Sequence, residues 1–134
     1  MIAPLATAPR HRTAHGTSSW TIPQLLEATR GQLVHGSLDG AVDGISIDSR
    51  TLTPGEAFLA IHGPRYDGHA FLEDARRRGA ACLIVSRYDT SSHGVASVPR
   101  ILVEDTQVAL GELARAHRRR IGCPVIAVTG TCGK

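Results

Sequence analysis

A glycine-rich turn follows an apolar run close to the end of the sequence. Residues 125–128 read VIAV and predict a strand, and TGTCGK follows at 129–134. Successive backbone N–H groups in such a turn form a cradle for an anion, and the closing lysine can reach the phosphates of a nucleotide. The strict spacing G-x-x-x-x-G-K would place glycine at position 128, where this chain has Val128. The motif alone therefore leaves two interpretations open, a nucleotide-phosphate loop and an ordinary glycine-rich turn.

A second group of polar residues lies at the end of a predicted strand. Asp48, Ser49 and Arg50 bring together a carboxylate, a hydroxyl and a guanidinium. The next predicted strand ends in a loop with two glycines and a proline, HGPRYDGH at 62–69. Because ligands of open α/β sheets bind at the carboxyl ends of the strands, these two segments predict a phosphate site.

Two interpretations of these segments remain open. In the first, Ser49 and the backbone near Gly63 hold a phosphate, and Arg65 pairs with it. In the second, Asp48 and Arg50 form a structural ion pair and the loop is a plain connection. The residue types alone favour neither interpretation.

The elements that must position these groups are strands and helices in alternation. Short apolar or alternating runs predict strands at 32–36, 45–48, 57–61, 80–86, 100–103 and 125–129. In the strand at 45–48, Ile45 and Ile47 should face the same side. Longer runs with apolar residues on one side predict helices at 21–31, 70–79 and 105–120. The β–α–β order predicts an α/β layered domain with a small mixed sheet, and the IGCP break at 121–124 predicts a domain boundary.

Polar residues at the predicted helix ends have the chemistry of caps. Thr21 and Gln24 have the spacing of a capping box, and Gly31 is the predicted stop of the first helix. Either Asp105 or Thr106 is expected to cap the helix at 105–120. These caps support the helix assignments independently of the apolar pattern.

The composition indicates a globular and mildly basic chain. Of its 134 residues, 42% are hydrophobic and 20% are charged, and the formal net charge is +3. The arginine clusters at 76–78 and 118–120 are interpreted as solvated helix ends, because a nucleic-acid surface would bring more charge and more aromatic residues. We therefore expect no nucleic-acid partner. We also expect no membrane span, because the apolar stretches are shorter than the roughly 18 residues that a span needs.

Cysteine and histidine positions bear on compartment and metal binding. Cys82, Cys123 and Cys132 form no CxxC pair, and Cys82 lies in an apolar run that predicts core. The odd count fits a reducing cytosol, so we expect a cytoplasmic protein. The seven histidines lack clustered ligand spacing, and no metal site is expected. Residues 1–19 lack acidic residues and predict a disordered tail, although a transit peptide has a similar composition.

The stretch DSRTLTPGEAFLAIHGPRYDGHAFLEDARRRGAACLIVS, at 48–86, resembles the N-terminal domain of the Mur ligases. These are ATP-dependent, amide-forming enzymes of peptidoglycan assembly. Their glycine loop is also shortened, to T-G-[TS]-x-G-K, and TGTCGK is similar to it, so the departure from the strict spacing supports the resemblance. The resemblance covers 20–134. Within the family, YDGHAF and DTQVALGELA are most similar to the member that adds D-alanyl-D-alanine to UDP-N-acetylmuramoyl-tripeptide.

The resemblance implies a three-domain enzyme. One domain would hold the UDP end of the UDP-N-acetylmuramoyl-peptide, a central domain would hold ATP and Mg²⁺, and a third would help to hold D-alanyl-D-alanine. ATP would phosphorylate the terminal carboxylate of the peptide, and the dipeptide amine would attack the acyl phosphate. We expect 1–19 to be the tail, 20–121 the UDP-substrate domain and 122–134 the start of the ATP domain, which is cut off here. The chain alone would hold no catalytic residue and would be an inactive monomer.

Site residues carried over from the family by position form two sets. The set for the UDP moiety is the apolar uridine neighbour Ile47, the nucleotide contact Ser49, and the loop residues Gly63, Pro64, Arg65 and Tyr66. The set for the ATP phosphates is Gly130, Thr131, Cys132, Gly133 and Lys134. Cys132 stands where Asn or Ser is common, and a thiol is a weak hydrogen-bond partner, so the backbone would supply the contacts there.

Two other functions remain open at this stage. One is the sibling ligase that adds the third peptide residue to UDP-N-acetylmuramoyl-dipeptide, because its DSR region is similar. The other is a stand-alone nucleotide-sugar binding module without catalysis. Continuation of the reading frame past Lys134 would separate a ligase from a binding module.

Overall fold

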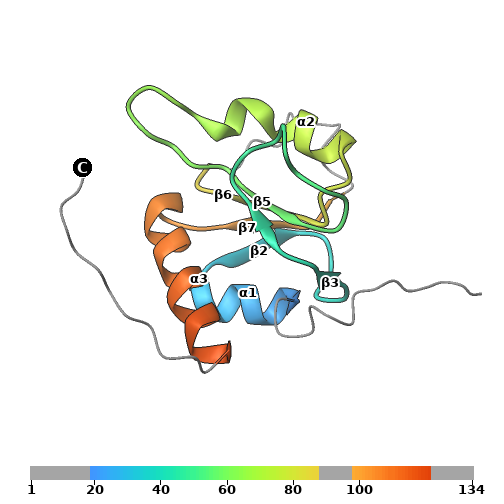
Figure 1. The fold of residues 1–134 in the computed structure, drawn as a ribbon, viewed down its shortest axis with the longest axis vertical. Coiled ribbons are helices and arrows are strands. Elements are labelled where there is room, and N and C mark those ends of the chain that lie inside the picture. Colours follow the sequence, from blue (N-terminus) through green and yellow to red (C-terminus); the bar gives the residue numbers. More distant parts are fainter. Residues whose placement is uncertain (1–18, 88–97, 122–134) are drawn as a thin grey trace, which may run out of the picture.

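The computed structural model describes residues 19–87 and 98–121. Its strands are β1 (Trp20–Thr21), β2 (Gln32–His35), β3 (Ala41–Val42), β4 (Ile45–Ser46), β5 (Ala57–Leu59), β6 (Cys82–Val85) and β7 (Arg100–Leu102). Five of them form a sheet in the order β2-β7-β6-β5-β4, with β4 to β7 parallel and β2 antiparallel at one edge. β1 and β3 form a separate antiparallel pair. This mixed α/β arrangement confirms the predicted fold class (Figure 1).

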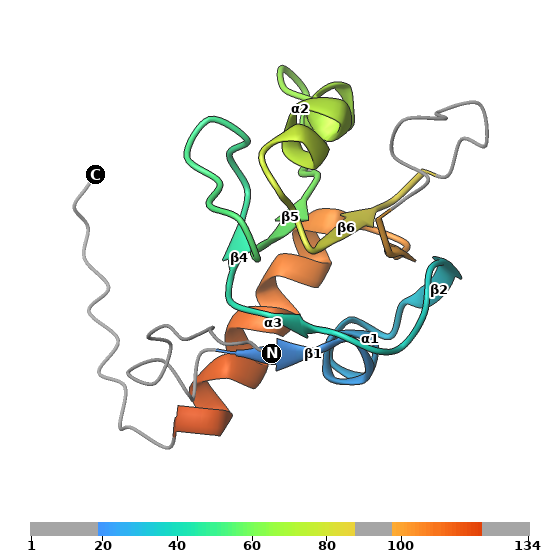
Figure 2. The same ribbon diagram turned by 90° about the vertical axis from the view of Figure 1, so that its right-hand side faces the viewer.

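Helices cover both faces of the five-stranded sheet. They are α1 (Ile22–Thr29), the short 3-10 helix η3 (Gly68–Phe71), α2 (Leu72–Arg77) and α3 (Thr106–Ile121). α1 and α3 pack against each other on one face, and α2 lies on the other (Figures 1 and 2). The predicted strand at 125–129 and the glycine loop after it lie outside the described residues, as does most of the predicted tail.

The central strands divide the core into two layers because successive side chains of a strand point to opposite faces. In β5 and the residue after it, Ala57 and Leu59 join the cluster under α1 and α3. Phe58 and Ala60 join the cluster under α2. All four side chains are fully buried. The continuous apolar run AFLA therefore belongs to a strand that is buried on both faces, as parallel strands usually are.

The capping box of the first helix is confirmed. The Thr21 hydroxyl accepts a hydrogen bond from the Gln24 backbone N–H at 3.2 Å, and the Gln24 side chain accepts from the Thr21 N–H at 2.9 Å. At the start of α3 the cap is Asp105, whose carboxylate accepts from the N–H groups of Gln107 and Val108 at 2.8 and 3.2 Å. Thr106 is the first residue of α3 and is buried.

Three local expectations need correction. The stop of α1 is Arg30, which adopts a left-handed φ of 59°, rather than Gly31. The strand at 45–48 ends at Ser46, so Ile45 packs on the core while Ile47 is 45% exposed, and the two do not share a face. The helix predicted at 70–79 is shorter and begins as the 3-10 turn η3.

Other expectations can be checked against burial. Cys82 is fully buried, as predicted, and burial raises the pKa of its thiol to about 12. Such a thiol is unreactive at neutral pH. In the described part of the chain, no helix has the length and apolar character of a membrane span.

Candidate functional site

The two segments singled out in the sequence meet at one edge of the sheet. β4 and β5 are parallel neighbours, with Ile45 opposite Ala57 and Ser46 opposite Phe58. The segments that leave these strands therefore start side by side at the carboxyl edge. In open α/β sheets this edge is the usual place for a ligand site.

A groove of about 630 Å³ opens between these segments. Its lining comes from 47–50 after β4 and from the loop and turn after β5, and consists of Ile47, Asp48, Ser49, Arg50, Tyr66 and Phe71. The rings of Tyr66 and Phe71 are stacked, with centroids 5.8 Å apart. Ile47, Tyr66 and Phe71 are all 40–45% exposed, so the groove presents apolar surface to solvent beside polar groups.

Ser49 lies deeper than the sequence indicated. Ser49, the predicted phosphate contact at the strand end, is only 3% exposed and still contributes to the groove lining. Among the described residues, this hydroxyl makes no hydrogen bond. Because the Ser49 oxygen keeps some contact with solvent, it has hydrogen-bonding capacity to offer a molecule in the groove.

Asp48 and Arg50 form the structural ion pair that was one of the two open interpretations. The Arg50 side chain donates from Nη2 to Asp48 Oδ2 at 2.9 Å and from Nε to Oδ1 at 3.1 Å, and its backbone N–H donates to Oδ1 at 2.9 Å. These bonds from Arg50 hold the pKa of the Asp48 carboxyl below its usual range. Asp48 and Arg50 also line the groove, so their structural ion pair is compatible with a place at the ligand site.

The loop residues predicted for the UDP moiety are only partly brought to the groove. The Gly63 N–H donates to the Tyr66 carbonyl at 2.7 Å and closes a tight turn. Pro64 and Arg65 lie at its exposed tip, and the groove lining includes Tyr66 but neither of them. The structure therefore brings together Ile47, Ser49 and Tyr66 and leaves Arg65 outside the lining.

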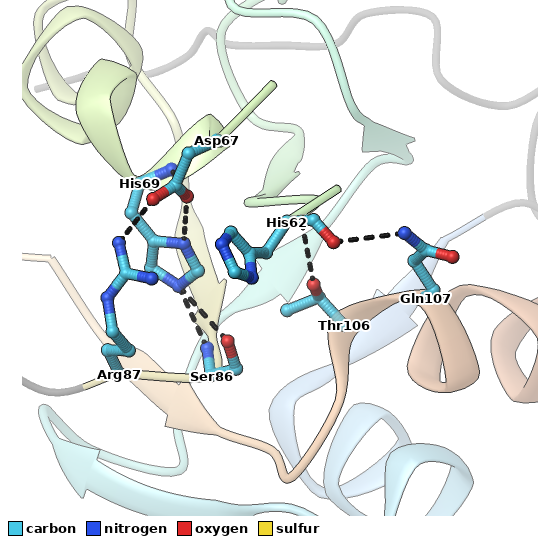
Figure 3. A network of polar contacts seen from close by, with 7 residues as sticks. All are labelled: His62, Asp67, His69, Ser86, Arg87, Thr106 and Gln107. Atoms are coloured by element: carbon cyan, nitrogen blue, oxygen red, sulfur yellow. Dashed lines mark hydrogen bonds and ion pairs between the residues drawn. The ribbon is translucent and has the colours of Figure 1, made fainter. Parts of the chain in front are cut away.

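A polar network at the end of this loop was not anticipated from the sequence (Figure 3). Asp67 Oδ1 lies 2.7 Å from His69 Nδ1, and Asp67 Oδ2 pairs with the Arg87 guanidinium. His69 Nε2 accepts a hydrogen bond from the Ser86 N–H at 3.0 Å. Burial raises the pKa of Asp67, but the hydrogen bonds from Arg87 and His69 outweigh it and lower that pKa below its usual range.

The start of the loop is attached to a different element. The His62 N–H donates to the Thr106 hydroxyl at 3.2 Å, and the Gln107 side chain donates to the His62 carbonyl at 2.9 Å. Thr106 thus serves the loop rather than capping α3. Figure 3 shows both attachments, at 62 to the start of α3 and at 67–69 to the end of β6.

A local sequence signal could have indicated only part of this network. The spacing Asp67-Gly68-His69 allows a carboxylate and an imidazole to meet across a turn, and Asp side chains commonly bond the backbone two residues on. Ser86 and Arg87 lie 17 and 20 residues away from their partners, and only the sheet brings them there. The predicted ATP residues 130–134 lie outside the described residues.

The fold and the groove define an α/β domain with a candidate ligand site at the carboxyl edge of a mixed sheet. Residues 41–118 match the Mur ligase family, catalytic domain. The chain belongs to this family. The family resemblance seen in the sequence is thereby confirmed.

Individual relatives come from two branches of the family. UDP-N-acetylmuramoyl-tripeptide–D-alanyl-D-alanine ligase of Escherichia coli (strain K12) is 38% identical over 117 residues, covering 87% of this chain and 24% of that protein. UDP-N-acetylmuramoyl-L-alanyl-D-glutamate–2,6-diaminopimelate ligase of Aquifex aeolicus (strain VF5) is 42% identical over 98 residues, covering 69% of this chain and 19% of that protein. A crystal structure of MurF from Acinetobacter baumannii superposes with a TM-score of 0.67 at 34% identity, covering 78% of this chain and 22% of that one. The chain spans about a quarter or less of the length of these relatives.

Proposed function

We propose that this chain is the substrate-binding N-terminal part of a longer ATP-dependent ligase that joins D-alanyl-D-alanine to UDP-N-acetylmuramoyl-tripeptide. The E. coli relative carries the name of that activity, and both it and the A. baumannii MurF structure align over most of the chain. The described part would hold the UDP end of the muramyl peptide. The helices and strands of this part run from Trp20 to Ile121, which is the range predicted for the UDP-substrate domain.

The observation that carries this proposal is the composition of the groove. A stacked aromatic pair stands beside the exposed guanidinium of Arg50 and beside the Ser49 hydroxyl, which makes no hydrogen bond to the described residues, at the carboxyl edge of the parallel strands. Uracil can stack on the exposed face of Tyr66, with Ile47 as an apolar neighbour. The Ser49 hydroxyl can donate to a diphosphate oxygen, and Arg50 can balance its charge. Gly63, Pro64 and Arg65 would flank the ligand from the loop tip, which follows from the family resemblance.

The ATP part of the proposal has a different basis. ATP with Mg²⁺ would supply the energy for amide formation, and the loop Gly130, Thr131, Cys132, Gly133 and Lys134 would cradle its phosphates. This assignment rests on the motif TGTCGK and on membership of the family. Residues 122–134 would then begin the ATP-binding domain, with 20–121 as the UDP-substrate domain. ATP and UDP-linked substrates place the proposed reaction in the cytoplasm.

A second candidate activity is favoured by one comparison. The A. aeolicus relative, named for diaminopimelate addition, is more identical over its shorter alignment than the E. coli relative is. The groove described here would serve either enzyme, because both names specify a UDP-N-acetylmuramoyl substrate. The choice between the two activities depends on the peptide end of the substrate and on the incoming amine.

The deciding experiment uses the complete protein with ATP and Mg²⁺. We expect phosphate release only when UDP-N-acetylmuramoyl-tripeptide and D-alanyl-D-alanine are both present. Release with UDP-N-acetylmuramoyl-dipeptide and diaminopimelate instead would assign the sibling activity. If the protein binds the nucleotide but releases no phosphate in either mixture, it is a nucleotide-sugar binding module without catalysis.

A further inference from the structure

The segment Asp67–Gly68–His69 makes the polar contacts at the end of the groove loop without lining the groove itself. We propose that Asp67 and His69 are positioning residues that attach this loop to the end of β6 and so hold the Tyr66 ring in place for the ligand. The inference rests on the proposed function of the groove. We call the chain of contacts Ser86–His69–Asp67–Arg87 the loop latch.

The latch has a defined proton arrangement. Because the Ser86 N–H donates to His69 Nε2 at 3.0 Å, that nitrogen must carry a lone pair. The proton of the neutral ring is then on Nδ1, which donates to Asp67 Oδ1 at 2.7 Å. Asp67 uses its other oxygen to bind Arg87. The His69 side chain is only 6% exposed, so the two contacts of the ring are shielded from water, whereas the Arg87 side chain is 54% exposed.

The latch lies between the two rings of the groove in the sequence. Tyr66 directly precedes Asp67, and Phe71 follows His69 by two residues. The Gly68 N–H donates to the Ile61 carbonyl at 2.7 Å, which brings this backbone against the end of β5. A displacement of Asp67 or His69 would therefore move both rings of the stacked pair.

Tyr66 depends on this attachment because its own side chain is 44% exposed. If the loop spends part of its time detached, the apparent affinity is the intrinsic affinity multiplied by the fraction of molecules in which the loop is attached. The latch would act on binding through that fraction and would contribute no contact to the ligand. Its substitution should weaken binding even though the groove lining is unchanged.

Protonation of His69 should open the latch, because an imidazolium has no lone pair to accept from Ser86. The titratable or charged groups that face the ring are Asp67, Arg87 and His62, whose ring centroid lies 6.4 Å away. Burial lowers the pKa of His69, Arg87 and His62 act in the same direction, and Asp67 opposes them. The ring is therefore neutral at neutral pH, and the latch is closed there.

Two substitutions separate the two bonds of the ring. In His69→Gln the side-chain oxygen can reach the position of Nε2 and accept from Ser86. In His69→Asn the shorter amide can reach only Asp67. We expect UDP-N-acetylmuramoyl-tripeptide to bind His69→Asn roughly tenfold more weakly than the unmutated chain, as for one lost hydrogen bond, and His69→Gln within about threefold.

The pH dependence of the same titrations gives a second readout. As the pH falls from neutral through the lowered pKa of His69, the unmutated chain should lose affinity and His69→Gln should not. His62→Gln is the matched control and should keep the loss, because its ring is not in the latch. Equal affinities for the Asn, Gln and unmutated chains, or equal pH dependence of the Gln and unmutated chains, would overturn the proposal.

A readout without ligand keeps the inference separate from the proposed function. Stacking shifts the aromatic proton signals of Tyr66 and Phe71, and we expect this shift to persist in His69→Gln and to decrease in His69→Asn. Retention of the shift in both variants contradicts the latch. If the unmutated chain binds no nucleotide, the proposed function fails, and the ring signals still decide on the latch. If His69→Asn does not fold, the pH dependence of the ring signals in the other two chains decides.

Discussion

The rings of Tyr66 and Phe71 lie nearly parallel, at an interplanar angle of 15° and a centroid distance of 5.8 Å. Tyr66 comes from the loop after β5, and Phe71 comes from the last position of η3. Aromatic pairs usually bury such a contact, but here both rings remain about 40% exposed. The pair therefore forms a flat apolar surface on which a base can stack.

The first prediction concerns that surface. Tyr66→Ala should weaken the binding of UDP roughly five- to a hundredfold, because stacking a base on an aromatic ring contributes about 1–3 kcal/mol. Tyr66→Phe keeps the ring and should bind like the unmutated chain. Calorimetric titration with UDP measures both. An unchanged affinity in Tyr66→Ala would show that the base lies elsewhere.

The hydroxyl of Ser49 gives a second prediction. Ser49→Ala should weaken UDP-N-acetylmuramoyl-tripeptide roughly ten- to a hundredfold, since a hydrogen bond to a charged group contributes about 1.5–3 kcal/mol. Stability should change little, because this hydroxyl makes no hydrogen bond within the described residues. Thr51→Ala is the control, since it removes a nearby exposed hydroxyl outside the groove lining. Equal binding by the Ser49 and Thr51 variants would make the DSR segment purely structural.

Arg65 should act on binding at long range. It is exposed and lies outside the groove lining, so its effect on an anionic ligand passes through solvent. Arg65→Ala should weaken binding at low salt, and the difference should shrink towards physiological salt, where the screening length is about 8 Å. Titrations at two salt concentrations test this. A large, salt-independent loss would mean that Arg65 contacts the diphosphate directly.

Gly68 provides a prediction about stability. A Cβ at this position would lie 2.9 Å from both the Ala60 Cα and the Ile61 N, which are backbone atoms that cannot rotate away. Gly68→Ala should therefore lower the free energy of unfolding by about 1–3 kcal/mol, the usual cost of overpacking. Gly111→Ala is the matched control, because a Cβ there meets nothing within 4 Å. This exposed position in α3 should gain up to about 1 kcal/mol from helix propensity. Urea unfolding of both variants measures the contrast, and equal effects would contradict it.

The latch predicts how stability depends on pH. The pKa of His69 is lower in the folded chain than its ordinary value of 6.5, so the unfolded chain binds the proton more readily. Its contribution to stability is complete above that ordinary value and is lost as the pH falls through the lower, folded pKa. Asp67 has the same sign at lower pH, with its contribution lost below the ordinary value of 3.8. As the pH falls through the folded pKa of His69, denaturant unfolding should show a smaller loss of stability in His69→Gln than in the unmutated chain. An identical loss in both chains would assign the effect to other groups.

The sequence predicted the core of the fold well because the signals there are local. The run AACLIVS predicted a strand buried on both faces, and β6 is fully buried from Cys82 to Val85. The capping box at Thr21 and Gln24 is a three-residue pattern, and both of its hydrogen bonds are present. Such features depend on neighbours in the chain, so a pattern can indicate them.

The site was only partly predictable because its geometry depends on contacts across the sheet. The strand-end rule correctly brought 47–50 next to the loop after β5. It could not indicate that Ser49 would be buried while Ile47 turns to solvent, because β4 ends two residues earlier than the alternation suggests. The contact of His69 with Ser86 likewise requires β6 to end beside η3, and no local pattern encodes it.

The most direct test of the central claim is to map UDP onto the isotope-labelled 134-residue chain by NMR. The account predicts that backbone amide signals shift at 47–50 and at 63–71, where the groove lies. It also predicts little change around the apolar cavity beside Trp20, Leu110 and His117, whose lining among the described residues has no hydroxyl side chain. Shifts confined to that cavity, or no shifts at millimolar UDP, would contradict the claim that the groove at Ser49 and Tyr66 is the nucleotide site.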